Sequence, residues 1–148
     1  MYKNILVAID DSATSRSALA EALHIARTSQ AKLYIAHVVD ETLMNMQGRT
    51  FTSSLNIEHA ITVLTGAGQQ LLAEVIKSAD GVDAEALLLE ARSRRVSEVL
   101  DEKARELNID LIVVGRHGKR GLATLILGSV AEQLAKMSAA SVLLVRKH

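Results

Sequence analysis

The chain has 148 residues, 49% of them apolar and 23% charged, which is the size and composition of one globular domain. Its 17 basic and 17 acidic residues balance and aromatic residues make up only 2%, so a general nucleic-acid-binding surface is not expected. The absence of cysteine excludes disulfide frameworks, thiolate metal sites and a cysteine nucleophile.

Short apolar runs alternate with helical patterns along the chain. Residues 5–9 (ILVAI) are an unbroken run of strand formers, typical of a strand buried on both faces. Ser12 can cap the helix that follows, whose apolar residues recur at helical spacing as far as Ala26. Later elements are expected as strands at 32–39, around 86–89, at 111–114 and at 141–145, and as helices over about 57–78, across 96–107 and across 130–137.

This order predicts one α/β domain over residues 1–148, a doubly wound, Rossmann-like parallel sheet with helices on both faces. If the five strands lie in the order 3-2-1-4-5, the chain reverses direction between the first and fourth strands. A ligand crevice would then open at their carboxyl ends, at residues 8–12 and 114–118. The irregular stretch 40–56 is expected to be a long loop at the same edge.

No targeting or membrane segment is expected from the sequence. The apolar run near the start is short and is followed by two aspartates, unlike a signal peptide. The longest nearly apolar stretch, residues 122–131, is about half of the ~20 residues that a membrane span requires. We therefore expect a cytoplasmic protein without membrane insertion.

The most informative segment is GRHGKRG at 115–121, which continues to Gly128 and Ser129. Glycines let the backbone approach a ligand closely, and the N–H groups of such a turn can surround an anion. A single glycine would only end the strand, but this spacing after a buried strand favours phosphate binding. Three basic residues add positive charge, while His117 could contact phosphate or face solvent; the basic residues are Arg116, Lys119 and Arg120.

Ser129 and Glu132 match a capping box, with Ser129 as the N-cap of the last helix. The same helix start offers unpaired N–H groups and the positive end of the helix dipole. A phosphate could be held there by the Ser129 hydroxyl and the amides of Ser129 and Val130, with Gly128 leaving room for it.

Asp10 and Asp11 follow the first strand. Asp10 could accept hydrogen bonds from a ribose or help to hold a hydrated Mg²⁺, and both aspartates could instead serve only the start of the helix. We favour the functional interpretation for Asp10 and leave both open for Asp11.

Other chemical signatures are weaker. The Walker A sequence, the dinucleotide fingerprint and the nucleophile elbow are absent, and the five histidines lack metal-ligand spacing, so we assign no catalytic residue and no metal ligand. His37 is expected to be a satisfied histidine within a strand. Residues 66–68 (GAG) predict a weak point or a packing contact inside a helix, and residues 92–95 (RSRR) a solvated surface offset by nearby acids.

The pattern Gly115-x2-Gly118-x9-Gly128-Ser129 resembles the nucleotide-binding signature of the universal stress protein family. With KNILVAIDDS, AHVVDE, DLIVVGRHGKRGLATLILGSVAEQL and SVLLVRK, the resemblance covers essentially the whole chain. It implies a five-stranded parallel sheet of order 3-2-1-4-5 and a homodimer formed through the last strand, Ser141 to Arg146. Such pairing would also cover an apolar edge strand that otherwise invites aggregation.

The resemblance further implies binding of ATP or a related adenine nucleotide, with Mg²⁺ or Mn²⁺. Adenine and ribose would lie near Ala8, Ile9, Asp10 and the backbone of Val38, with Val114 and Gly115 beside the ribose. The phosphates would be held by Gly118, Gly128, Ser129 and Val130. Two departures from the family are Asp11, where many members have glycine, and the turn at 91–95 (ARSRR).

Three functions remain open at this point. The first is a dimeric regulatory module of a stress response, whose ATP-bound state is read by an unidentified protein partner. The second is a slow ATPase or phosphotransferase using the same site, which ranks lower because we find no general base beyond Asp10. The third is a nucleotide-independent dimeric scaffold, against which the intact glycine motif argues.

Overall fold

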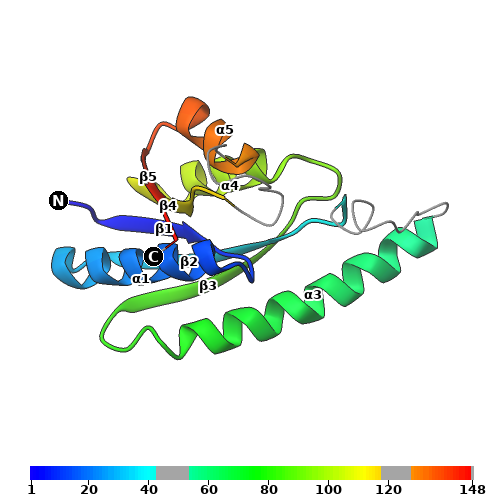
Figure 1. Cartoon of the computed structure of the whole chain (residues 1–148), viewed down its shortest axis with the longest axis horizontal. Coiled ribbons are helices and arrows are strands. Elements are labelled where there is room, and N and C mark those ends of the chain that lie inside the picture. Colours follow the sequence, from blue (N-terminus) through cyan, green and yellow to red (C-terminus); the bar gives the residue numbers. More distant parts are fainter. Residues whose placement is uncertain (43–53, 118–127, 148) are drawn as a thin grey trace.

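The structure, a computed structural model, describes residues 1–42, 54–117 and 128–147 (Figure 1). Five parallel strands form one sheet in the order β3-β2-β1-β4-β5, so the predicted doubly wound fold is confirmed. The elements in chain order are β1 (Asn4–Ala8), α1 (Ala13–Ser29), β2 (Lys32–Val39), α3 (Ser54–Ile76), β3 (Asp83–Glu90), α4 (Val96–Glu106), β4 (Leu111–Gly115), α5 (Ser129–Met137) and β5 (Ser141–Val145).

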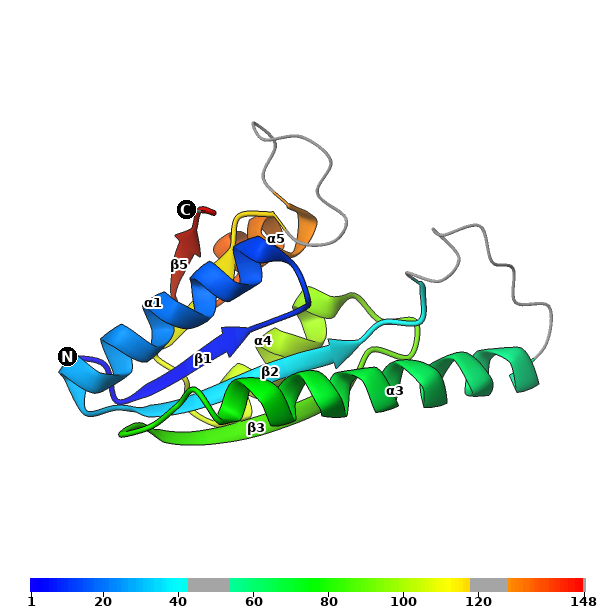
Figure 2. The same ribbon diagram turned by 60° about the horizontal axis from the view of Figure 1, so that its bottom comes forward.

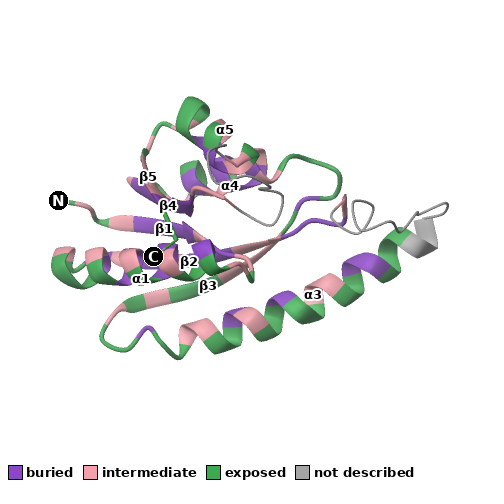
Figure 3. Cartoon of the chain, viewed as in Figure 1, coloured by how far each residue is buried: buried purple, intermediate pink, exposed green. Residues whose placement is uncertain are grey.

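Helices cover both faces of the sheet. Helices α1 and α3 lie on one face, and α4 and α5 lie on the other (Figures 1 and 2). Side chains of β1 alternate between the two cores, since Ile5 and Val7 pack toward α1 whereas Leu6 packs toward α4 and α5. Strands β1 and β4 are therefore buried on both sides, as their unbroken apolar runs predict (Figure 3).

The start of α1 shows how local sequence sets the fold. Ser12 is its N-cap, and the Ser12 hydroxyl accepts a hydrogen bond from Ser15 N–H at 3.2 Å, which confirms the predicted cap. Ala18, Ala22 and Ala26 recur at helical spacing and are buried, and their small side chains let α1 lie close to the sheet.

Helix α3 begins at Ser54, three residues earlier than predicted, so the loop expected over 40–56 ends sooner. Residues 43–53 of that loop lie outside the described part of the chain. The amino-terminal part of α3 runs beyond the carboxyl end of the sheet in both views (Figures 1 and 2). Within the described residues, none of the helices is both long and apolar enough to cross a membrane.

Candidate functional site

A cavity of about 220 Å³ opens at the carboxyl ends of β1, β2 and β4, where the strand order predicts a crevice. Most of the predicted site residues line it: Ala8, Ile9, Asp10, Val38, Val114, Gly115, His117, Gly128, Ser129 and Val130. Arg116, also a predicted site residue, lies in sequence between Gly115 and His117, and its N–H donates to the Val145 carbonyl at 2.8 Å. Gly118 lies outside the described residues, together with Lys119 and Arg120.

A backbone hydrogen bond joins the described ends of the glycine motif. Gly128 N–H donates to the Arg116 carbonyl at 2.7 Å, so the start of α5 lies against the end of β4. These two segments are distant in sequence, and this contact brings both to the rim of the same cavity.

The predicted capping box at Ser129 is wrong. Gly128 is the N-cap, with φ −61° and ψ 150°, and Ser129 is already the first residue of α5. Glycine and serine are both accepted at this position, and the bond to Arg116 places Gly128 where the extended cap conformation is needed. The Glu132 carboxylate accepts from Lys136 instead of reaching back to the cap. Gly128 provides no side-chain cap, so among the described residues no N-cap side chain competes with a ligand or solvent for the first amides of α5.

Gly115 has a structural reason to be glycine. A Cβ atom there would lie 2.6 Å from Cγ2 of Thr14 and 3.3 Å from the Thr14 carbonyl carbon. The missing side chain therefore lets the first turn of α1 pack onto the end of β4, while the Gly115 backbone still lines the cavity.

Asp10 serves the helix start and also lines the cavity. Its carboxylate accepts from Ser12 N–H at 2.8 Å, and its own N–H donates to the Ser15 hydroxyl at 2.8 Å. These bonds fix the turn between β1 and α1 and hold the Asp10 side chain at the cavity wall. The two interpretations of Asp10 are thus compatible. Asp11, which is exposed, also lines the cavity.

His37 lies in β2 and lines the cavity, which the sequence did not predict. Its Nδ1 lies 2.9 Å from the carbonyl oxygen of Ile9. A carbonyl only accepts, so Nδ1 carries the proton and His37 is a satisfied histidine, as expected. The Cδ2 edge of its ring faces Gly68 of α3, where an added Cβ would lie only 2.7 Å away.

The apolar residues that α3 and α4 contribute to the cavity wall were not predicted from the sequence. Val96 and Leu100 come from the first turns of α4, and they could have been found from the rule that loops after parallel strands meet at one edge. The α3 residues depend on long-range packing that no local pattern reveals. The further lining residues are Ser12, Ser15, Ala36, Val39, Asp40, Leu64, Ala67, Gly68, Leu71 and Ala131.

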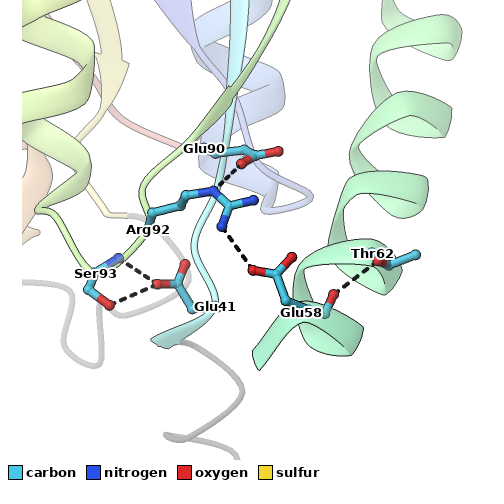
Figure 4. A network of polar contacts seen from close by, with 6 residues as sticks. All are labelled: Glu41, Glu58, Thr62, Glu90, Arg92 and Ser93. Carbon is cyan, nitrogen blue, oxygen red and sulfur yellow. Dashed lines mark hydrogen bonds and ion pairs between the residues drawn. The ribbon is translucent and has the colours of Figure 1, made fainter. Parts of the chain in front are cut away.

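The basic turn after β3 is neutralised by neighbouring acids (Figure 4). Arg92 contacts the carboxylates of Glu90 at 2.7 Å and Glu58 at 3.0 Å. The hydrogen bond to Glu90, followed by that to Glu58, raises the pKa of Arg92. Arg94 and Arg95 pair with Glu102 and Glu98, so the solvated surface predicted for this turn is confirmed.

Comparison with known proteins identifies the chain's relatives. A family model described as the universal stress protein family matches residues 1–146. Universal stress protein YxiE of Bacillus subtilis is 33% identical over 149 residues, covering 99% of this chain and 100% of that protein.

Solved structures share the fold of this chain. Universal stress protein UspA from Lactobacillus plantarum has a TM-score of 0.83 at 21% identity and covers 98% of both chains. A universal stress protein crystallised in complex with cAMP has a TM-score of 0.69 at 28% identity, covering 99% of this chain and 98% of that one. Since the family model spans nearly all of the sequence, the chain belongs to the universal stress protein family.

Proposed function

We propose that this chain binds an adenine nucleotide, ATP in first place, in the cavity at the carboxyl ends of β1, β2 and β4. The observation that carries the proposal is the bond from Gly128 N–H to the Arg116 carbonyl. It holds the amino end of α5 against the end of β4, and both line the same cavity as the ends of β1 and β2, so groups suited to phosphate and to a base share one cavity.

The walls suit a purine base. Val38, Val96 and Leu100 provide apolar surface from two different elements, and Ala8 and Ala36 are small enough to leave space between them. Pockets of this kind pair apolar walls with a few placed polar groups. We expect the base to lie between β2 and the first turn of α4.

The start of α5 suits the phosphates. In the described part of the chain its N-cap, Gly128, offers the first N–H groups no side-chain cap, and the positive end of the helix dipole lies at the cavity beside Ser129 and Val130. Backbone N–H groups at such a position bind phosphate without a dedicated side chain.

Asp10 fits the ribose and the metal ion. Its carboxylate is held at the cavity wall, from which it can accept from a ribose hydroxyl or contribute one oxygen to Mg²⁺ or Mn²⁺. Within the described ranges, no group of three or more metal-ligating side chains occurs. A nucleotide-bound Mg²⁺ needs no such group, because phosphates and water supply most of its ligands.

A relative supports the nucleotide class. The universal stress protein that is 28% identical to this chain was crystallised with cAMP, an adenine nucleotide. We propose that this chain uses binding as a regulatory signal in a stress response, which requires the ligand to favour one of two states. The cytoplasmic location stays a prediction from the sequence.

Thermal unfolding with and without nucleotide tests the proposal. ATP should stabilise the protein by RT ln(1 + [L]/Kd), about 2.7 kcal/mol at a hundredfold excess over Kd. Gly128→Val should abolish this stabilisation, because the new side chain fills the space in front of α5. Gly66→Ala, which changes an exposed glycine outside the cavity, is the control and should keep it. An unchanged ATP response in Gly128→Val would contradict the assignment.

Two further measurements separate the alternatives. The sequence has no tryptophan and only two tyrosines, so a co-purified adenine nucleotide would dominate absorbance near 260 nm. Single-turnover assays with ATP distinguish a regulator from an enzyme, since only an enzyme would release phosphate within a regulatory cycle. A protein that neither carries nor responds to nucleotide would instead be the scaffold.

We also propose that β5 pairs with β5 of a second copy. β5 is an edge strand, bonded to β4 alone in the described sheet, and an open edge of apolar sequence is prone to association. Val145 C=O and Ser141 N–H bond toward β4, so the backbone groups of Val142 and Leu144 point outward.

Two single proline substitutions in β5 test this dimer. Val142→Pro removes an outward N–H and should shift the protein to monomer in light-scattering chromatography while the fold survives. Leu143→Pro removes an N–H that faces β4 and should destabilise the fold itself. A Val142→Pro protein that stays dimeric would place the dimer contact elsewhere.

A further inference from the structure

The ladder between β1 and β2 ends in an unusual way. The strand register stops at Ala8 opposite Ala36, and Ile9 N–H still donates to the Ala36 carbonyl at 2.8 Å. One more step would bring the Val38 N–H to the Ile9 carbonyl. That carbonyl instead accepts from the ring Nδ1 of His37 at 2.9 Å.

The backbone of Val38 faces across the end of β1. Successive residues of an extended strand turn their N–H and C=O groups to opposite sides. The Ala36 carbonyl bonds toward β1, and the Val39 carbonyl bonds toward the β3 side, where it accepts from Ala91 N–H at 2.9 Å. Val38 therefore has the same orientation as Ala36, and it lines the cavity just beyond Ile9.

Helix α3 also holds the His37 ring in place, in addition to the hydrogen bond with Ile9. An added Cβ at Gly68 would lie 2.7 Å from its Cδ2 and 3.3 Å from its Nε2. Only glycine at this position of α3 leaves space for the ring in its present place. The His37 ring is thus fixed between helix α3 and the carbonyl of Ile9, which follows β1.

We propose that His37 is a positioning residue for the nucleotide. By donating from Nδ1 to the Ile9 carbonyl, it ends the β1–β2 ladder and leaves the N–H and C=O of Val38 for the base. This inference rests on the proposed function, since it assumes that the base lies against β2.

The N–H and C=O of Val38 complement the hydrogen-bonding edge of adenine. Adenine presents the acceptor N1 beside the donor N6, which complements an N–H beside a C=O. Guanine presents a donor and an acceptor in the reverse order, and with the sugar held near Asp10 the base cannot turn over to compensate. His37 would then contribute to the selection of adenine although its own side chain makes no hydrogen bond to the base.

Two substitutions of His37 separate positioning from packing. His37→Leu removes the donor, so the Ile9 carbonyl is left to pair with Val38 N–H. His37→Asn keeps an N–H near the place of Nδ1 and should behave like the wild type. Gly68→Ala displaces the ring from the other side and should resemble His37→Leu in part.

The primary measurement is amide hydrogen exchange of Val38 in the nucleotide-free protein, followed by NMR after ¹⁵N-valine labelling. We expect His37→Leu to slow the exchange of this amide by about tenfold or more, as a new ladder bond would. His37→Asn should leave it near the wild-type rate. Equal exchange rates in the wild type and in His37→Leu would overturn the proposal.

Nucleotide affinity is the second measurement. His37→Leu should weaken ADP binding by about tenfold, the size of one lost hydrogen bond, and reduce the preference for ADP over GDP. His37→Asn should restore both. Unchanged affinity and selectivity in His37→Leu would overturn the role in recognition. If the wild type binds no nucleotide at all, the proposed function fails, while the exchange experiment still decides whether His37 ends the ladder.

Discussion

Two glycines in one helix should respond in opposite ways to the same substitution. Gly66 and Gly68 are two residues apart in the middle of α3. An added Cβ at Gly66 would meet no atom within 4 Å, whereas at Gly68 it would lie 2.7 Å from His37 Cδ2 and 2.9 Å from Leu88 Cδ1. The pair therefore separates helix propensity from packing within a single element.

The magnitudes follow from these distances. Replacing glycine by alanine inside a helix stabilises it by about 0.5–1 kcal/mol, and at Gly66 this should be the whole effect. Gly68→Ala has the same conformational gain, but the new methyl group must displace His37 and Leu88, and such overpacking costs about 1–3 kcal/mol. We expect Gly66→Ala to be more stable than the wild type and Gly68→Ala to be less stable, with about 1–3 kcal/mol between the two variants.

Urea unfolding followed by far-ultraviolet circular dichroism measures both changes, since the chain has no tryptophan for fluorescence. The slope of the unfolding free energy against urea should stay constant in all three proteins, so that the midpoints report stability alone. If Gly68→Ala is stabilised as much as Gly66→Ala, the close contact between α3 and His37 is refuted.

Three other substitutions test the local arguments. Gly115→Ala should lower the free energy of unfolding by about 1–3 kcal/mol through its clash with Thr14, and the double variant with Thr14→Ala should recover part of that loss in a denaturant titration. Ser12→Ala should cost about 1 kcal/mol, since it removes the acceptor for Ser15 N–H; a loss near zero would mean that α1 is capped by other means. Arg92→Ala should leave the unfolding midpoint close to that of the wild type despite its two ion pairs, because all three side chains are exposed to solvent and screened by it, and a clear fall in the midpoint would show that the network in Figure 4 has a larger structural role.

Local pattern was sufficient for most of the fold. The bounds of β2 and β5, residues 32–39 and 141–145, are those predicted, because apolar strand formers are flanked there by polar or small residues. The cap of α1 was found because a serine hydroxyl precedes a periodic apolar run without competition. The order of the strands was available only through the resemblance of the glycine motif to a family.

Other features could not be derived from local pattern. Gly128 and Ser129 are both acceptable N-caps, and the choice between them depends on the bond from Gly128 to Arg116, which lies outside the helix and its cap. The contact of His37 with Gly68 depends on how α3 lies across the sheet. Periodicity shows which face of an element is buried, but it does not show which atoms meet there.

The cavity is assembled from turns and strand ends that come from almost every part of the chain, from Ala8 near the start to Ala131 near the finish. No fragment of the polypeptide contains the whole of it, so a ligand cannot recognise a partly folded molecule that lacks one of these pieces. Occupancy would therefore act on the unfolding equilibrium of the entire domain and would make resistance to proteolysis depend on the supply of that ligand. A cell could use this property to adjust the lifetime of the protein to its nucleotide pool without any change in synthesis.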